Sequence, residues 1–409
     1  MHLQNVSLQD AWISLVKEAF ALKYWRGYLV ALALAACAWG LMEFAQSHWV
    51  LVDMIYPYTS RLIQNFMTNW SSGATYCLWQ LFILILVAGA IASIVLMIVL
   101  KWNPIQWFGW IMSVVSLVVL LNTGLYGLNA YAGPLADDIR LDVTDYTVAE
   151  LQNAAAFYQE KANELAPQVK RDSSGQVDFA DFDTLAQQAA DGFDRLTYEE
   201  FYSVFAGNRL SVKELGWSGF FTGKGKTFVY VGITGEAAVN PETPDLGLPF
   251  AMCQAMSNRI CIANQQDAAF AAFLACTHNE SKEFQYSGYF MAYRYCYNAL
   301  NDLNIASAQA VAQRLQGLES RQLRQDMERY NASFAAGSDY AYYTPEEKSD
   351  NRATDKVPVA DAPQRSHVAD LLVNWHIQKY VLPMQEQEEV TFDPMDETQV
   401  DLSGIKHAQ

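Results

Sequence analysis

One segment of the chain, Tyr76–Leu100, contains no charged residue, and this feature constrains the fold more than any other. A helix that crosses the apolar core of a bilayer needs about 20 apolar residues, a length over which soluble proteins rarely lack charge. Two further segments, Gly27–Gln46 and Gln106–Asn129, are similarly apolar, and tryptophans gather near the segment ends as in an interfacial aromatic belt. The sequence therefore predicts a three-helix transmembrane region at residues 27–130.

The basic residues indicate an orientation, because short cytoplasmic segments carry an excess of Lys and Arg. Three cations precede the first helix, and Lys101 lies between the second and the third. The segment between the first two helices holds Arg61, which Asp53 offsets. We expect a multi-pass protein of the inner (cell) membrane. Residues 1–26 would be cytoplasmic, with an amphipathic helix at Ser7–Tyr24 along the inner surface, and the large C-terminal part would lie outside.

An alternative interpretation concerns Leu34–Cys37, whose sequence Leu-Ala-Ala-Cys resembles a lipoprotein cleavage site. The apolar run before it is short, and two further apolar segments follow. An uncleaved first helix therefore explains the segment better.

Most of the charge follows the membrane region. The 409 residues include 27 Lys and Arg and 44 Asp and Glu, of which five and four, respectively, precede residue 131. The remaining 22 basic and 40 acidic residues repel polyanions, which argues against a nucleic acid partner. The lipid bilayer is the partner that the sequence predicts most directly.

Residues 131–382 are expected to form a mainly helical α+β domain, followed by an acidic, flexible tail at residues 383–409. Thr147 and Glu150 have the spacing of a helix capping box. The β-branched and aromatic run Thr227–Ile233 predicts a strand of a small sheet. The expected helices are Thr147–Gln168, Asp181–Arg195, Tyr198–Phe205, Pro249–Phe273, Tyr286–Leu303, Ser307–Glu328 and Val368–Tyr380.

Four cysteines lie in the apolar part of this domain. We interpret them as small buried hydrophobic residues in preference to disulfide partners, and the chain has no Cys-x-x-Cys pair that would favour a thiolate metal site. These cysteines are Cys253, Cys261, Cys276 and Cys296.

Several short motifs occur in the order found in one family of bacterial membrane proteins. The specific ones are Gly232-Ile-Thr-Gly-Glu-Ala-Ala-Val-Asn240, Leu248-Pro-Phe250, Phe273-Leu-Ala-Cys276 and Tyr286-Ser-Gly-Tyr289. Ile55-Tyr-Pro57 and Tyr126-Gly-Leu-Asn129, near the membrane helices, fit as well. On these motifs the chain resembles domain-of-unknown-function family 3810, from the segment after the first membrane helix to about Leu372.

In that family the helix after Leu-Pro-Phe carries His-Glu-x-x-His, as in a zincin metallopeptidase, where two His bind zinc and the Glu activates water. The resemblance therefore implies a zincin-like domain. Here the three positions hold Gln254, Ala255 and Asn258, and Asp267 is the remaining carboxylate of the acidic cluster. Neutral amides bind zinc poorly, and alanine accepts no proton. We expect no zinc, no other cofactor and no hydrolysis by the family mechanism, with Gln254 and Asn258 bonded to each other instead.

The resemblance also suggests a peptide groove, since zincins pair a peptide with an edge strand beside the metal helix. Gly235, Glu236 and Asn240 follow the predicted strand and are candidates for its lining, as is Tyr286 on a later helix. A turn in which Asn240 bonds to the backbone is an equally good explanation. Tyr286 and Tyr289, at helical spacing, are also typical of a core.

Three functions remain open. The first is a pseudoenzyme that binds a peptide, an envelope protein or a wall component without cutting it. The second is a hydrolase of altered chemistry, although no Ser/His/Asp or Cys/His order supports one; its groups would be Asp267, His278, Cys253 or Glu236. The third is a structural subunit of a membrane complex, since the small residues at Gly89–Ala92 permit close helix packing.

Overall fold

The structure is a computed structural model that describes residues 22–303, 305–333, 356–357 and 368–383. Most of the amphipathic helix expected at Ser7–Tyr24 lies outside the described residues, as does the tail after residue 383.

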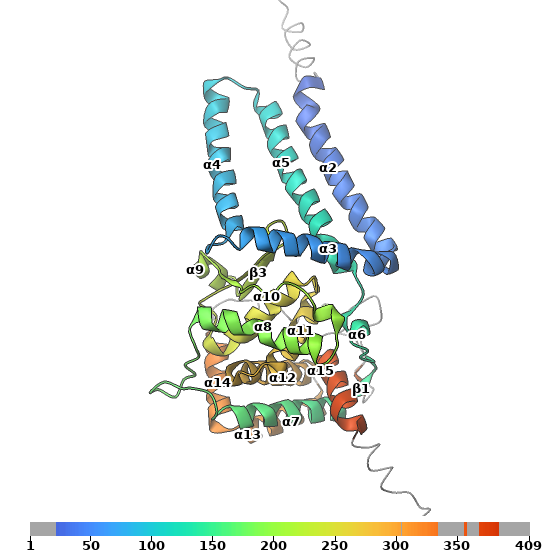
Figure 1. Ribbon diagram of the computed structural model, residues 1–409, viewed down its shortest axis with the longest axis vertical. Coiled ribbons are helices and arrows are strands. Elements are labelled where there is room, and N and C mark those ends of the chain that lie inside the picture. Colours follow the sequence, from blue (N-terminus) through green and yellow to red (C-terminus); the bar gives the residue numbers. More distant parts are fainter. Residues whose placement is uncertain (1–21, 304, 334–355, 358–367, 384–409) are drawn as a thin grey trace, which may run out of the picture.

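Three helices are long and apolar enough to cross a membrane, which confirms the predicted membrane-anchor-like N-terminus. They are α2 (Leu22–Ser47), α4 (Leu78–Val99) and α5 (Pro104–Leu125), and they extend from one end of the remaining structure (Figure 1). The N-terminus of α2 and the turn between α4 and α5 lie at the end away from the rest of the chain (Figure 1). Helix α5 is shorter than predicted, because the chain tightens into a 3-10 turn at Gly127–Tyr131.

Helices α2 and α5 pack closely, whereas α4 stands apart. A Cβ atom on Gly27 would lie 2.5 Å from the carbonyl carbon of Gly109, so the two backbones touch at this point. The Ser113 hydroxyl donates to the Gly27 carbonyl at 2.6 Å. The most apolar 18 residues of α4 contain no buried side chain, so most of its surface is free to contact lipid or another helix.

Between the first two apolar helices, where the sequence analysis expected no helix, the chain forms helix α3 (Trp49–Ser71). It lies across the ends of the other three helices that face the rest of the chain (Figure 1). Its polar side chains face inward: Ser60 and Gln64 are fully buried, and both donate to the Leu125 carbonyl, at 3.1 and 3.0 Å. Its apolar side chains face outward at roughly every fourth position. These exposed residues are Val50, Leu51, Met54, Ile55, Tyr58, Leu62, Phe66 and Trp70. A helix with this pattern fits the boundary between protein and lipid.

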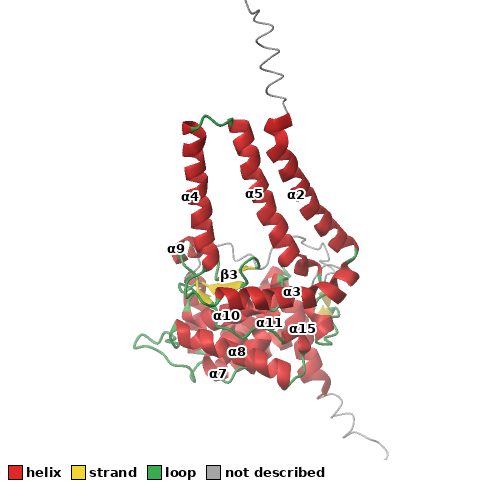
Figure 2. Cartoon of the chain, turned by 45° about the horizontal axis from the view of Figure 1, so that its top comes forward, coloured by secondary structure: helices red, strands yellow, loops and turns green. Residues whose placement is uncertain are grey.

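The rest of the chain forms a mainly helical body below α3 (Figure 2). Its helices are α6 (Leu135–Asp138), α7 (Val148–Leu165), α8 (Phe182–Tyr198), α9 (Ser218–Thr222), α10 (Leu248–Arg259), α11 (Gln265–His278), α12 (Lys282–Asp302), α13 (Ala306–Leu318), α14 (Arg321–Ala332) and α15 (Val368–His376). The capping box of Thr147 and Glu150 is present at the start of α7. The long apolar core is centred on α7, α10, α11 and α12.

Three expected helices have different limits. The helix expected at Pro249–Phe273 is two helices, α10 and α11, because Cys261 adopts a left-handed φ of 74° and the Asn264 side chain caps a new start. The helix expected at Ser307–Glu328 is likewise divided into α13 and α14, with Ser320 as the new cap. The piece expected at Tyr198–Phe205 holds only a 3-10 turn at Ser203–Phe205.

A three-stranded sheet lies at the end of the body that faces the membrane helices (Figure 2). Its order is β2-β4-β3, from β2 (Lys213–Glu214), β3 (Phe228–Val231) and β4 (Glu236–Val239). Strand β3 falls within the predicted run and pairs antiparallel with β4, while β2 pairs parallel with β4 and forms an edge. A second ladder pairs β1 (Tyr146–Thr147) with β5 (Lys356–Val357).

We expect the exposed side of α3 to contact lipid. A spin label at Phe66→Cys in the full chain, reconstituted into liposomes, should be more accessible to oxygen than to a water-soluble nickel reagent, because oxygen partitions into the acyl region. Cys37→Ala is a suitable background, since Cys37 is exposed and the other five thiols are buried. The control is Leu318→Cys, at the exposed last residue of α13, a helix that lies at the end of the body away from α3 (Figure 1), and it should show the opposite ratio. Equal ratios at the two positions would contradict a lipid-facing α3.

Candidate functional site

The carboxylate of Glu236 lies at the N-terminus of α4, one of the apolar helices. Its Oε1 accepts a hydrogen bond from the backbone N–H of Leu78 at 2.8 Å, and its Oε2 accepts one from Trp79 at 2.9 Å. The first N–H groups of a helix have no partner within the helix, and Cys77 at the N-cap position provides no side-chain cap. Glu236, on β4, therefore caps α4 from a distant part of the chain, with a charge that suits the helix dipole.

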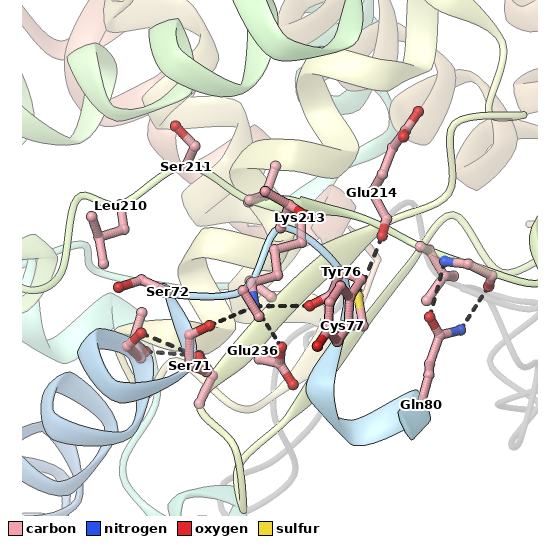
Figure 3. A pocket seen from close by; sticks show the side chains of 18 of the residues that line it. Ser71, Ser72, Tyr76, Cys77, Gln80, Leu210, Ser211, Lys213, Glu214 and Glu236 are labelled. Carbon is pink, nitrogen blue, oxygen red and sulfur yellow. Dashed lines mark hydrogen bonds and ion pairs between the residues drawn. The ribbon is translucent and has the colours of Figure 1, made fainter. Parts of the chain in front are cut away.

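Lys213 completes this junction from the edge strand β2. Its ammonium group lies 2.7 Å from Glu236 Oε1 and also donates to the carbonyls of Ser71 and Tyr76, at 2.8 and 3.2 Å (Figure 3). The Gln80 side chain pairs with the backbone of Gly216 through two hydrogen bonds, of 2.7 and 3.1 Å (Figure 3). The sheet is thus bonded to the end of α3, the start of α4 and the turn between them.

Gly235 brings the sheet against α3. The Thr68 hydroxyl donates to the Gly235 carbonyl at 2.7 Å. Gly235 has a φ of +64°, and a Cβ atom there would lie 2.6 Å from the backbone nitrogen of Thr68. Both the left-handed backbone and the close approach therefore require glycine at this position.

Gly235→Ala should lower the free energy of unfolding by about 2–4 kcal/mol, because the left-handed conformation and the overlap with α3 both disfavour a side chain. Gly175→Ala is the matched control. Gly175 has a φ of +78°, but a Cβ atom there would meet no atom within 4 Å. Alanine at this position therefore adds only the cost of the left-handed backbone conformation. Thermal unfolding of both variants in one detergent separates the two effects. Equal losses would show that the contact with α3 contributes nothing.

The three positions that the resemblance aligns with His-Glu-x-x-His lie on α10 and are closed to solvent. Gln254 and Asn258 are each 3% exposed, and Ala255 is fully buried. The hydroxyl of Tyr126, from the end of α5, donates to Asn258 Oδ1 at 3.1 Å. Asn258 Nδ2 donates to the backbone carbonyl of Gln254 at 3.2 Å, so the expected bond between the two side-chain amides does not form.

Asp267 lies in the first turn of α11 and is 3% exposed. Its Oδ2 accepts from the backbone N–H of Leu135 at 3.4 Å, which ties α11 to the segment after the membrane helices. Beside Gln254 there is a hollow of about 20 Å³, which suits a single water molecule. This hollow is too small for a substrate.

The residues at these positions do not fit a catalytic zinc ion. Gln254 and Asn258 offer neutral amides, and Asn258 Oδ1 already accepts from Tyr126. Within the described ranges, no group of three or more His, Cys, Asp or Glu side chains is placed to hold a metal ion.

A larger cavity of about 740 Å³ lies elsewhere, between the α3–α4 junction and the edge strand β2 (Figure 3). Gly235 and Glu236 line it, so two of the four candidate groove residues border a real cavity. Lys213 and Arg259 add basic groups to its wall, and Ser72 and Thr75 line its exposed rim.

The other two groove candidates lie away from this cavity. Asn240 is 2% exposed: its Nδ2 donates to the Thr222 hydroxyl at 2.8 Å, and its Oδ1 accepts from the backbone of Glu242 at 3.0 Å, as in the alternative turn. Tyr286 is fully buried and donates to Asp326 Oδ2 at 2.6 Å. Burial, and then the charge of Asp326, raise the pKa of the Tyr286 hydroxyl well above its usual range, so it stays protonated as a donor.

Groups considered for an altered chemistry are occupied within the fold. His278 Nδ1 lies 2.8 Å from the Leu274 carbonyl, one turn earlier on α11. Cys253 is buried on α10, and all six cysteines are free thiols. Burial, followed by the neighbouring Cys253, raises the pKa of Cys276 well above its usual range, so this thiol is a poor nucleophile at neutral pH.

A family model described as protein of unknown function (DUF3810) matches residues 52–352, which is more than half of the chain. The chain belongs to this family. The match begins within α3 and extends beyond α14, so the DUF3810 region includes α4, α5 and most of the helical body. No curated protein and no solved structure matches the chain significantly.

Sequence reasoning missed several residues that the DUF3810 structure brings to the cavity and to α10. Arg259 had a visible signal, since it is the one charged residue in the otherwise uncharged run Leu248–Gln266. Lys213, Gln80 and Tyr126 had none, because each acts on a partner more than 20 residues away along the chain.

Proposed function

We propose that this DUF3810 member is a membrane-anchored, non-hydrolytic binding protein, built on a scaffold that resembles a zinc peptidase. The observation that carries the proposal is the state of α10: amides and alanine occupy the His-Glu-x-x-His positions, and Tyr126 bonds to Asn258 across them. Hydrolysis by a zincin needs two imidazole ligands and a general base, and none of these groups is available at the described α10 positions.

The cavity at β2 is the place where we propose that the ligand binds. A volume of about 740 Å³ lies in the range of small-molecule sites and also accommodates a few residues of a peptide. We propose a peptide, an envelope protein or a wall component as the ligand, and an orientation in which residues 131–382 form a domain outside the inner membrane, with residues 1–26 in the cytoplasm.

Metal analysis and a cleavage assay test the proposal that the chain does not catalyse zinc-dependent peptide hydrolysis. We expect the full chain, purified in detergent without chelators, to contain far less than one zinc per chain and to leave a mixed peptide library intact. The triple variant Gln254→His, Ala255→Glu and Asn258→His, combined with Tyr126→Phe, is the comparison for metal loading. Stoichiometric zinc in the wild-type chain, or cleavage that a chelator abolishes, would overturn the proposal.

Site-specific photocrosslinking in cells tests the binding site. A photoreactive amino acid at Thr75, on the exposed rim of the cavity, should give a discrete crosslinked product. The same amino acid at Leu318, which is exposed at the end of α13 and does not line the cavity, should not. Identical products at both positions, or none at Thr75, would argue against ligand binding in this cavity.

One observation favours a second function, as a structural subunit of a membrane complex. The lipid-exposed α4 carries Gly89 in a position where an added Cβ would meet no atom within 4 Å, so a partner helix could approach closely. Gly89→Leu should then dissociate a complex seen on native gels, whereas Gly40→Leu on α2, also in open space, should not. Loss of the complex with both variants, or with neither, would leave no role for this face.

A further inference from the structure

Arg259, the last residue of α10, is a buried cation whose charge is not balanced. Its side chain is 2% exposed. The guanidinium donates to the backbone carbonyls of Leu210 and Ser211, and its Nε–H has no hydrogen-bond partner among the described residues. Across the described part of the chain, no carboxylate lies within ion-pair distance of Arg259.

Burial of such a charge raises the free energy of the folded state. The loss of hydration of a guanidinium is offset only when an anion and further hydrogen bonds replace the water. Burial lowers the pKa of Arg259 to about 10, so the group still carries its charge at neutral pH. Two carbonyl dipoles offset part of the cost and leave a net positive charge in the wall of the cavity.

Apart from Arg259, the charged side chains in the interior of this cavity nearly cancel one another. Lys213 is paired with Glu236 at 2.7 Å, so these two charges cancel. Asp183 and Glu214 line the rim and are exposed to solvent, which screens them. The whole lining holds two cations and three carboxylates, but Arg259 is the one buried charge among them without a counter-ion, and an anion of charge −1 is its electrostatic complement.

The position of the cavity indicates which class of anion it could bind. Its walls include the last turn of α3 and the first turn of α4, next to Phe66, Trp70 and Tyr76, whose side chains are exposed. A phosphodiester carries one negative charge at neutral pH and accepts the paired donors of a guanidinium. Phosphodiesters occur in two sources: the headgroups of lipids, which lie at the membrane surface near the ends of α3 and α4, and soluble molecules.

We propose that the cavity between the α3–α4 junction and β2 binds a monoanionic phosphodiester, with Arg259 as its counter-ion. This inference rests on the proposed binding function and deepens it by naming the chemistry of the ligand. It concerns the cavity and not the closed α10 positions.

The test uses the full chain, stripped of metals with a chelator, and three probes: glycerophosphoglycerol, inorganic phosphate, and phosphatidylglycerol against phosphatidylcholine in nanodiscs. We expect one of the phosphodiesters to raise the melting temperature. Arg259→Met should weaken that binding about tenfold or more, since a charge-assisted hydrogen bond contributes about 1.5–3 kcal/mol. Without any probe, Arg259→Met should melt no lower than wild type, because it removes an unbalanced buried charge.

Arg209→Met is the matched control, because Arg209 is a neighbouring arginine whose charge Asp194 balances at 2.7 Å. It should leave phosphodiester binding unchanged. Retention of phosphatidylglycerol in native mass spectra, lost in Arg259→Met, assigns the anion to a lipid headgroup; binding of glycerophosphoglycerol alone assigns it to a soluble ligand. The proposal is overturned if no phosphodiester binds, if inorganic phosphate binds as well as the diesters, or if Arg209→Met has the same effect as Arg259→Met. None of these outcomes depends on zinc or cleavage, so the non-hydrolytic function is judged separately.

Discussion

Replacement of Glu236 by glutamine should lower the free energy of unfolding by about 3–5 kcal/mol, the cost of removing one partner from a buried ion pair. The side chain of Glu236 is fully buried, and that of Lys213 is 13% exposed. Glutamine keeps one carbonyl oxygen and can therefore satisfy one of the two N–H groups at the start of α4. It leaves the other N–H without an acceptor and Lys213 without a balancing charge.

Thermal unfolding of the full chain in detergent measures the effect, which corresponds to a decrease in melting temperature of roughly 6–20 °C for a body of this size. Glu242→Gln is the matched control, because Glu242 accepts from two side-chain hydroxyls, Ser218 and Thr222, in the same part of the chain but is exposed. The double variant Glu236→Gln with Lys213→Met should recover part of the loss. If Glu242→Gln is as destabilising as Glu236→Gln, the cap on α4 is not a major source of stability.

Asp326→Asn should destabilise the helical body by about 3 kcal/mol or more, since it leaves a second buried cation unbalanced. Asp326 on α14 receives two hydrogen bonds from the Arg171 guanidinium, at 3.0 and 2.7 Å, and one from the Tyr286 hydroxyl. The side chains of Asp326 and Arg171 are 2% and 12% exposed. This network joins α12, α14 and the segment after α7.

Chemical denaturation is a suitable measurement when it is followed through the fluorescence of Trp375, which is buried on α15, with the other tryptophans replaced by phenylalanine, because nine of the eleven tryptophans precede residue 131. Glu328→Gln, an exposed carboxylate on the same helix, should change stability by less than about 0.5 kcal/mol. A small effect of Asp326→Asn would mean that the carbonyls of Ala166 and Gly175, which also accept from Arg171, are sufficient to hold it.

The apolar helices and the capping box were predictable because their signals are local. A charge-free segment such as Tyr76–Leu100 has few alternatives to a membrane helix, and Thr147 and Glu150 interact within one turn. Helix α3 also has a local signal, in the outward residues that recur near every fourth position. It was missed because its apolar face is narrow and Pro57 interrupts the run.

The site was harder to predict, because its contacts depend on the tertiary structure. The resemblance selected Gln254, Ala255 and Asn258 as positions to inspect, but it gave no indication that Tyr126 would lie against them. Gly235 and Glu236 were selected for a groove, and they line a cavity, yet their strongest contacts hold α3 and α4. The division between α10 and α11 had no Gly or Pro to mark it, since Cys261 takes the left-handed conformation.

The cap on α4 has a consequence for the timing of synthesis. Glu236 lies 158 residues after Leu78 in the chain. At about 5–20 residues per second, the ribosome needs roughly 8–30 seconds to produce that stretch. During this interval the first turn of α4 lacks its carboxylate, and α3 lacks the sheet to which Thr68 bonds. The first turn of α4 is therefore made long before the carboxylate that caps it, and α4 gains this cap only when the sheet has formed beside it.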